Sequence, residues 1–235
     1  MPVTPPPSTA PADDGPADRN RWLLPGLGAL AAVSAVIAAV VIFSSGGAST
    51  PAKDPEAQVR TSDDALIVGR PDAPTTVVVF EDFASTASRE FEIASRDFLE
   101  VEAAQGNVLV QYRPFAPTDD YSRQAFQAWD AVLRHGTAEE AMAFHELLFD
   151  RQASPTGTEP TVAELDAWAV EAGADKGLVS AALERPDPAP VESAREDAQA
   201  AGVGLPPAVV VDGRTLTGSS GLDLADQLQR RILED

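Results

Sequence analysis

Cysteine is absent from all 235 residues of the sequence. Without a thiol the chain forms no disulfide, offers no nucleophilic sulfur and supplies no thiolate ligand to a metal. Thiol–disulfide oxidoreductase activity of its own is therefore excluded. The same absence says nothing about the redox compartment, because domains without cysteine are stable in oxidising and reducing surroundings alike.

Positive charge is scarce as well. The sequence holds 17 Lys and Arg against 37 Asp and Glu, a formal net charge of -20 at pH 7. Such a chain repels nucleic acid and anionic lipid headgroups, so we expect neither as the main partner. The two histidines, His135 and His145, make no metal-ligand cluster without cysteine. Glycine-rich phosphate-binding motifs are also missing, and we expect no metal and no cofactor.

One long hydrophobic run stands near the N-terminus. The 22 residues from Trp22 to Phe43 carry no charge, and a helix of that length spans about 33 Å, enough to cross a bilayer core. The sequence thus predicts a single transmembrane helix at residues 22–43. Arg19 and Arg21 precede it, and no charge follows until Lys53. By the positive-inside rule the N-terminus is cytoplasmic and the C-terminal domain is extracytoplasmic, anchored in the cell membrane by a single pass.

Composition divides the rest of the chain into three parts. Residues 1–21 are rich in Pro, Ala and Asp, and we expect a disordered cytoplasmic N-terminus. Residues 44–64 combine Ser, Gly and Pro with charges, and we expect a flexible linker. Residues 65–235 are long enough to bury one core, so we expect a single domain there.

The domain opens with a strand, a helix and a strand. Residues 77–80, Val-Val-Val-Phe, form a continuous apolar run typical of a strand buried on both faces. Phe91, Phe98 and Val101 recur at helical spacing, and residues 108–113 have the pattern of a second strand. Three such elements within about forty residues predict a right-handed βαβ unit with parallel strands.

Helices follow, and then the strand pattern returns. Apolar residues at helical spacing predict a helical segment over about 116–202. After it, residues 208–211 predict a strand, Asp212-Gly213 a hairpin turn and residues 222–233 a final helix. The helices predicted within the segment are 121–134, 138–150, 161–172, 176–184 and 191–201.

Four local sequences resemble the DsbA-like branch of the thioredoxin superfamily. Residues 68–74 (VGRPDAP) and 79–83 (VFEDF) are similar to the family's approach to its active site, and residues 144–149 (FHELLF) to one of its insertion helices. Residues 203–213 (VGLPPAVVVDG) are similar to its cis-proline loop, strand and turn. The resemblance covers residues 65–235 and implies a thioredoxin-like α/β fold with a DsbA-like helical insertion at about 116–202. It also implies that Pro207 is the cis-proline.

The active site itself departs from the family. The family places C-x-x-C directly after the Glu-Asp-Phe approach, and this chain has Ser85-Thr86-Ala87-Ser88 there. A serine hydroxyl forms neither a thiolate nor a mixed disulfide, so neither step of thiol exchange can run. Pro206 is a second departure, because it lacks the N–H with which this position pairs with an extended peptide. We treat residues 85–88 and Pro206-Pro207 as a degenerate site with no catalytic residue.

Three interpretations of Ser85 stay open from the sequence. Ser85 caps the helix that follows, which needs no ligand. Alternatively the helix N-terminus holds an anion or a ligand's thiolate. As a third alternative, Ser85 or Ser88 is a hydrolytic nucleophile, but His135 and His145 lie in the helical segment without a visible orienting partner. We expect His145, beside Phe144 on an amphipathic helix, to be a half-buried structural side chain.

These features predict a membrane-anchored, extracytoplasmic, redox-inactive DsbA-like protein, a binding or scaffolding module of the cell envelope with a protein or peptide partner. The alternative is an enzyme or ligand-binding protein that uses Ser85 at the helix N-terminus for a small anionic or thiol ligand. A third interpretation is an oxidoreductase relative whose activity was lost, naturally or by engineering, when serines replaced the cysteines.

Overall fold

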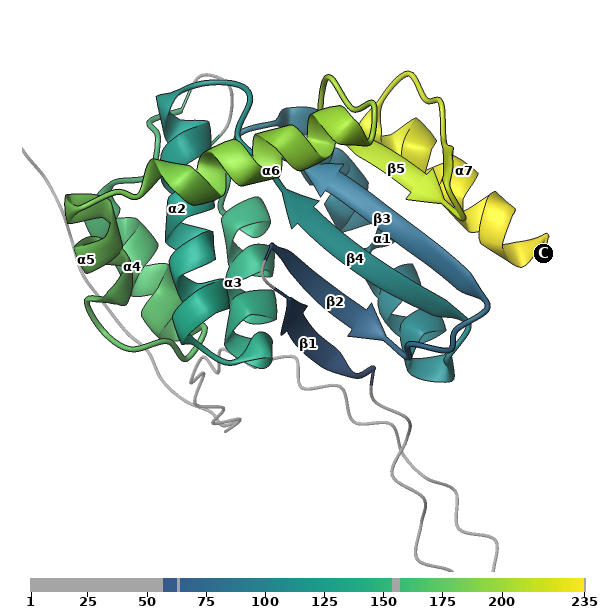
Figure 1. Cartoon of the computed structure of the whole chain (residues 1–235), viewed down its shortest axis with the longest axis horizontal. Helices are drawn as coiled ribbons and strands as arrows, with labels where there is room; N and C mark the ends of the chain where they lie inside the picture. The colour runs from purple at the N-terminus through teal and green to yellow at the C-terminus, as the bar shows by residue number, and fades with distance from the viewer. Residues whose placement is uncertain (1–56, 63, 154–156, 235) are drawn as a thin grey trace, which may run out of the picture. The chain divides into compact units, whose positions relative to one another are not determined.

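The computed structural model describes residues 57–62, 64–153 and 157–234. In this part of the chain a six-stranded mixed sheet has the order β1-β2-β4-β3-β5-β6 (Figure 1). Only β3 and β4 run parallel, and the other neighbouring pairs are antiparallel. The strands are β1 (Val59–Ser62), β2 (Ala65–Gly69), β3 (Thr75–Glu81), β4 (Val108–Pro114), β5 (Ala208–Val211) and β6 (Arg214–Thr215).

The predicted βαβ unit is confirmed. β3 and β4 pair in parallel from Thr75 opposite Val108 to Glu81 opposite Pro114. Helix α1 (Thr86–Gln105) joins them and ends at Gly106, whose φ of 83° lies in the left-handed region that glycine favours. The predicted hairpin is confirmed as well, because β5 and β6 pair antiparallel around the Asp212-Gly213 turn.

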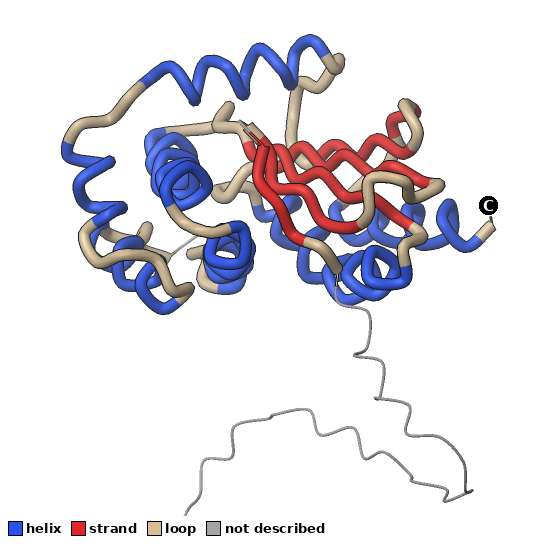
Figure 2. Tube along the Cα trace, turned by 60° about the horizontal axis from the view of Figure 1, so that its bottom comes forward, coloured by secondary structure: helices blue, strands red, loops and turns tan. Residues whose placement is uncertain are grey.

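Helices cover the two faces of the sheet unequally. α1 and α7 pack together on one face, whereas on the other side α6 runs along α2 and only its C-terminal part reaches over one end of the sheet (Figures 1 and 2). The predicted helical segment between β4 and β5 is confirmed, and four of its helices lie beside the sheet (Figure 1). The bounds are α2 (Asp120–His135), α3 (Ala138–Asp150), α4 (Val162–Glu171), α5 (Leu178–Glu184), α6 (Pro188–Ala200) and α7 (Gly221–Leu233).

The sheet begins earlier than the sequence indicates. Val59–Ser62 belong to the expected linker of residues 44–64, but they form the edge strand β1. β1 pairs antiparallel with β2, with Val59 opposite Val68. The linker boundary expected at residue 64 is therefore wrong. The strand is short and half of it is exposed, so it shows no apolar alternation that would reveal it.

Among the described residues, no helix is both long and apolar enough to cross a membrane. The transmembrane helix expected at residues 22–43 and the segment 1–21 lie outside the described residues. The membrane anchor and its orientation therefore stay predictions.

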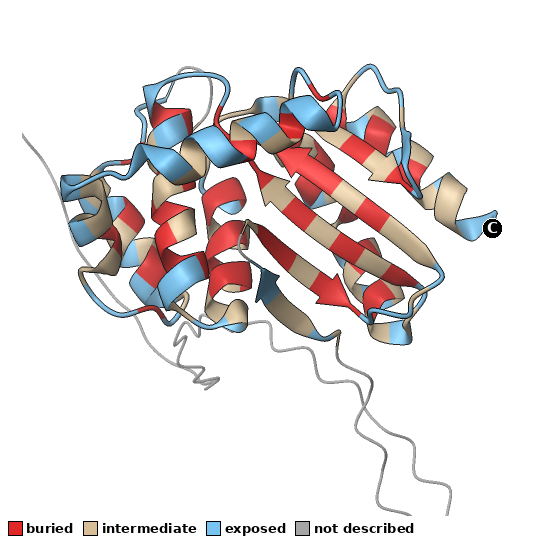
Figure 3. Ribbon diagram, viewed as in Figure 1, coloured by how far each residue is buried: buried red, intermediate tan, exposed pale blue. Residues whose placement is uncertain are grey.

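Two apolar clusters hold the domain together. The main cluster joins the sheet to α1, α2, α3 and α7 and includes Trp129, Phe91 and Phe144. The second cluster lies on the opposite face of the sheet, under α6. Its buried members are Phe80, Phe115, Ala116, Phe126, Ala194, Ala198 and Val203. Buried positions alternate along the strands, as a sheet with two differently covered faces requires (Figure 3).

The contact between α7 and α1 leaves no room for a side chain at Gly221. A Cβ there would lie 2.1 Å from the carbonyl oxygen of Ala87 and 2.6 Å from the nitrogen of Phe91. Gly221→Ala should therefore push α7 away from α1 and lower the free energy of unfolding by about 1–3 kcal/mol. Gly204→Ala is the control, because a Cβ there meets no atom within 4 Å, and it should change stability by less than about 0.5 kcal/mol. Urea denaturation measures both, and equal losses would contradict the close packing.

Candidate functional site

Residues 85–88 form the turn from β3 into α1. Ser85 is the N-cap of α1, and its Oγ accepts a hydrogen bond from the Ser88 N–H at 3.2 Å. Thr86 is exposed at the first helical position, whereas Ser88 is fully buried. The Ser88 Oγ accepts the N–H of Asp82 at 3.2 Å. Both hydroxyls thus satisfy backbone donors of the turn, and the capping interpretation of Ser85 is confirmed.

Asp82 ties this turn to the helical insertion. Its carboxylate accepts hydrogen bonds from the Ala84 N–H at 2.9 Å, from the Ser122 hydroxyl at 2.8 Å and from the Thr118 hydroxyl at 2.5 Å. Burial raises the pKa of Asp82, and the hydrogen bonds from Thr118, Ala84 and Ser122 oppose that rise. The start of α2 is therefore fixed against the end of β3.

The end of α3 holds the same turn from another side. The Gln152 Nε2 donates to the carbonyl oxygens of Phe83 at 2.6 Å and Ser85 at 3.1 Å. In return the Arg89 Nε donates to the carbonyl oxygen of Phe149 at 2.8 Å. Sequence reasoning missed Gln152, because a glutamine after a helix carries no signal of a partner about 67 residues away.

The proline loop lies at the same end of the sheet. The Pro206–Pro207 peptide bond is cis, which confirms the prediction for Pro207. Ala208 lies opposite Phe80 in the antiparallel β5–β3 pair, so Pro207 falls level with Glu81, four residues before Ser85. Leu205, directly before the two prolines, is 80% exposed. The structure thus brings the two parts of the predicted degenerate site to one end of the sheet.

Glu81 and His145 form a pair in the interior. The Glu81 Oε1 lies 2.5 Å from the His145 Nε2, and both side chains have no exposed area. The imidazole is surrounded by aromatic rings, with centroids 4.9 Å away at Tyr112, 5.1 Å at Phe149 and 5.7 Å at Phe83. His145 was expected to be half-buried, and this expectation is wrong. The sequence showed no orienting partner for it, and the structure gives Glu81 as that partner. It is fully buried because the amphipathic helix that carries it packs against the sheet end.

The apolar environment and the contact between the two side chains shift the pKa of each. Burial raises the pKa of Glu81, although the positive charge of His145 opposes the rise. Burial lowers the pKa of His145, but the charge of Glu81 and the hydrogen bond to it outweigh burial and raise it overall. The other polar atoms of the pair, Glu81 Oε2 and His145 Nδ1, have no partner in the described structure. One proton on the pair leaves no isolated charge in the interior.

The geometry gives no support to a serine nucleophile. Within the described residues no hydrogen bond joins Ser85 or Ser88 to a histidine, and His145 is engaged by Glu81. His135 lies at the end of α2 and lines a surface cavity instead. No group of three or more His, Asp or Glu side chains that could hold a metal ion occurs in the described ranges.

Comparison with known proteins identifies the fold. A family model described as thioredoxin matches residues 61–230. No curated protein matches the sequence. Among solved structures, oxidised BdbD from Bacillus subtilis is 22% identical, with a TM-score of 0.63 over 77% of this chain and 98% of that chain. These findings confirm the predicted thioredoxin-like fold.

Two further structures are similar. MdbA from Corynebacterium diphtheriae, described as a thiol-disulfide oxidoreductase, is 16% identical, with a TM-score of 0.61 over 76% of this chain and 94% of that chain. Reduced DsbA from Mycobacterium tuberculosis is 25% identical, with a TM-score of 0.57 over 76% and 91% of the two chains. The predicted resemblance to DsbA-like proteins is confirmed, and the chain differs from the family's oxidoreductases in having no cysteine.

The turn should still hold the geometry of a dithiol site. The variant Ser85→Cys with Ser88→Cys should close a disulfide, because the first turn of a helix brings positions i and i+3 within bridging range. The thiol at position 85 should have a lowered pKa, since the helix N-terminus favours the thiolate. Absorbance of the thiolate against pH and catalysed insulin reduction measure these properties.

A matched pair of cysteines controls that experiment. Ser85→Cys with Ser95→Cys places the second thiol on the same helix, also in a buried position. Ten residues of helix separate the two by about 15 Å, beyond the reach of a disulfide. This control should form no intramolecular disulfide. A folded Ser85→Cys, Ser88→Cys variant that behaves like the control would refute the assignment of the site.

The Glu81–His145 pair should make stability depend on pH. Both groups have a raised pKa in the folded domain, so each contributes stability that is present below its unfolded value and lost as the pH rises. Above pH 6.5, the value of an unperturbed histidine, the unfolded chain binds neither proton while the pair still binds one. The free energy of unfolding should then fall by up to about 1.4 kcal/mol per pH unit.

Glu81→Gln tests this origin of the pH dependence. The variant removes the carboxylate that keeps the proton on the pair, so the slope above pH 6.5 should flatten. Glu139→Gln changes an exposed glutamate at the start of α3 and should keep the parent slope. Urea denaturation over a series of pH values measures all three proteins. A parent slope that survives in Glu81→Gln would show that the proton is held elsewhere.

Proposed function

The chain belongs to the thioredoxin family, and from this premise we propose a membrane-anchored, extracytoplasmic protein without redox activity, a binding or scaffolding module of the cell envelope. One observation carries the proposal. The turn, the cis-proline loop and the helical insertion that surround a dithiol site in this family are all present. The two positions that hold cysteines in the family hold serines here, and their hydroxyls stabilise the turn.

The chemistry of thiol exchange requires what this chain lacks. A thiolate attacks a disulfide sulfur and passes through a mixed disulfide. MdbA, one of the similar structures, is described as a thiol-disulfide oxidoreductase. The present chain has no cysteine at any position, so it performs no exchange of its own. What it shares with such proteins is the fold around the former site, and binding is the function that this fold supports without a thiol.

The proline loop supports binding of an extended segment. Pro206 and Pro207 offer carbonyl oxygens but no N–H, so a partner strand beside them donates hydrogen bonds and receives none. Leu205 adds an apolar contact, because it is 80% exposed directly before the prolines. Single exposed leucines are ordinary on protein surfaces. The position of this one, in the loop that the family uses for extended peptides, favours a role in binding.

Anchoring rests on the sequence before the domain. The 22 uncharged residues from Trp22 to Phe43 are long enough for one membrane pass, and Arg19 and Arg21 on the N-terminal side favour a cytoplasmic N-terminus. The domain itself is acidic, and an acidic domain is repelled by anionic headgroups. It would therefore stand off the bilayer surface, where a protein partner can reach the proline loop.

The alternative, a protein that binds a small anionic or thiol ligand at Ser85, has weaker support. The Oγ of Ser85 already accepts the Ser88 N–H, and the Gln152 side chain occupies the carbonyl oxygens of Phe83 and Ser85. A thermal-shift series with phosphate, sulfate and glutathione separates the two functions, because a ligand that binds only the folded state raises the melting temperature.

Single cysteines test the proposal directly, because the parent has none. In intact cells a membrane-impermeant maleimide should label Leu205→Cys and Leu233→Cys, which replace side chains that are 80% and 71% exposed, and should not label Ser8→Cys. A cleavable, impermeant thiol crosslinker should then yield a protein adduct from position 205 but not from position 233. Labelling at Ser8→Cys alone would refute the orientation, and equal adducts at both leucines would refute binding at the proline loop.

A further inference from the structure

Helix α6 is attached to the domain by unusually small side chains. It has 13 residues, yet only Ala194 and Ala198 are buried. By contrast, α2 buries nine residues, among them Phe126 and Trp129. The outer surface of α6 is mostly exposed along its whole length (Figure 3). Val191 of the same helix is partly buried and also packs against the second cluster. Two alanine methyl groups and one partly buried valine remove little area from water, so this helix contributes less apolar burial than its length would allow.

Large aromatic side chains lie under these alanines. Phe80, Phe115 and Phe126 belong to the second cluster and are 5%, 3% and 4% exposed. The rings of Phe80 and Phe115 meet edge to face, with centroids 6.4 Å apart. The cluster is separate from the main core on the other face of the sheet. Phe126 also contacts Trp129 of the main cluster, with ring centroids 6.3 Å apart. Removal of α6 would therefore uncover an aromatic surface that stays supported from below by the main core.

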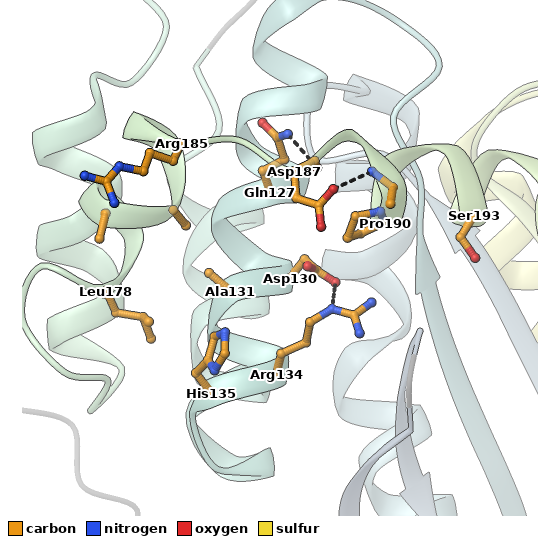
Figure 4. A pocket seen from close by; sticks show the side chains of 13 residues that line it. Gln127, Asp130, Ala131, Arg134, His135, Leu178, Arg185, Asp187, Pro190 and Ser193 are labelled. Carbon is orange, nitrogen blue, oxygen red and sulfur yellow. Dashed lines mark hydrogen bonds and ion pairs between the residues drawn. The ribbon is translucent and has the colours of Figure 1, made fainter.

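Polar contacts hold α6 only near its two ends. At the start, the Gln127 Nε2 donates to the carbonyl oxygen of Asp187, the N-cap residue, at 3.2 Å (Figure 4). Near the other end, Asp197 lies 3.5 Å from Arg113, which pairs more closely with Asp64 at 3.0 Å. At the same end Asp197 also shares a side-chain hydrogen bond with Asp64, and this contact raises the pKa of the Asp197 carboxyl. The pair of Glu192 and Arg195 lies within α6 itself.

Cavities flank both ends of α6. Two cavities of about 640 and 710 Å³ lie at its first turn and share Gln127 and Ala189. Figure 4 shows the first of them. A third, of about 650 Å³, is lined by Asp197 and Ala201 at the other end and by Val78 and Val210 of the sheet. Open hollows of the surface thus lie at both ends of this helix, where its few polar contacts also lie.

We propose that α6 is a lid. It lifts from the folded domain as a unit and uncovers a surface formed by Phe80, Phe115 and Phe126. This surface binds an apolar segment of the partner protein. The proposal rests on the binding function argued above. The chain runs directly from α6 through Val203 into the proline loop. Lifting α6 therefore enlarges the apolar surface beside that loop, and a partner segment bound there stabilises the open form.

Labelling of a buried cysteine measures the opening of the lid. Ala198 on α6 and Ala103 on α1 are both 1% exposed, so Ala198→Cys and Ala103→Cys are matched variants of a chain without other thiols. In the full-length protein in an uncharged detergent, a maleimide should modify Ala198→Cys roughly 100-fold faster than Ala103→Cys, because α6 opens locally whereas α1 is exposed only by global unfolding. Equal rates in two folded variants would overturn the proposal. Ala194→Cys, on the same face of α6, replaces Ala198→Cys if that variant does not fold.

A second pair of variants identifies the contact that closes the lid. Asp197→Ala, added to Ala198→Cys, removes the ion pair with Arg113 and the hydrogen bond with Asp64, so labelling should become about two- to five-fold faster. Glu192→Gln removes an ion pair within α6 and should leave the rate unchanged. Neither change should alter labelling of Ala103→Cys. The same rate in Asp197→Ala and Glu192→Gln would refute the assignment of Asp197 as the contact that closes the lid.

Peptides of defined composition test the surface under the lid. A peptide of alternating phenylalanine and leucine between lysine pairs suits an acidic domain, and it should accelerate labelling of Ala198→Cys in proportion to its concentration. A peptide with the same lysines around glycine and serine should have no effect. If both peptides leave the labelling rate unchanged, the surface binds no apolar segment and the proposal fails. The membrane orientation and partner binding at the proline loop are tested separately, by labelling and crosslinking of Leu205→Cys.

Discussion

Asp82 is the residue on which the site depends. Its N–H is bound by the Ser88 hydroxyl, and its carboxylate receives hydrogen bonds from its own loop and from the Thr118 and Ser122 hydroxyls. The end of β3, the start of α1 and the start of α2 therefore meet at one side chain. A buried carboxylate is costly without such donors, so each of them is held in place by the charge that it satisfies.

This arrangement explains how the geometry of the site persists without sulfur. The buried N–H of Asp82 requires an acceptor, and the Ser88 oxygen supplies one at 3.2 Å. A thiol in that position would be a weak acceptor. Ser85 likewise suits an N-cap, for which serine is among the preferred residues. Two serines thus strengthen the local hydrogen bonding of the turn, and at the same time they leave it without a nucleophile. In a protein that performs no thiol–disulfide exchange, serine therefore suits these two positions better than cysteine.

Sequence patterns were sufficient where structure is determined locally. The apolar run at residues 77–80 and the Asp212-Gly213 turn each act over a few residues, and both were predicted correctly. The Ser85 cap is equally local, and it was one of the three interpretations that the sequence left open. Pairings across long stretches of chain gave no such signal. The Glu81–His145 pair joins residues 64 positions apart, and Gln152 reaches residues 67 and 69 positions earlier, so both appear only when the insertion is folded onto the sheet. β1 was missed because its pairing with β2, not its own composition, makes it a strand.

The two faces of the sheet divide rigidity and adaptability between them. At the end of the sheet, the turn at residues 82–88 is held by α1, by the start of α2 and by Gln152, which follows α3. A turn that is fixed from three sides cannot change its conformation around a partner. On the other face, alanines cover aromatic rings. The free energy needed to separate two surfaces scales with the apolar area that both lose to each other. A helix that presents mainly methyl groups to phenyl rings therefore separates from this domain at a low cost in buried apolar area, and it leads directly into the proline loop.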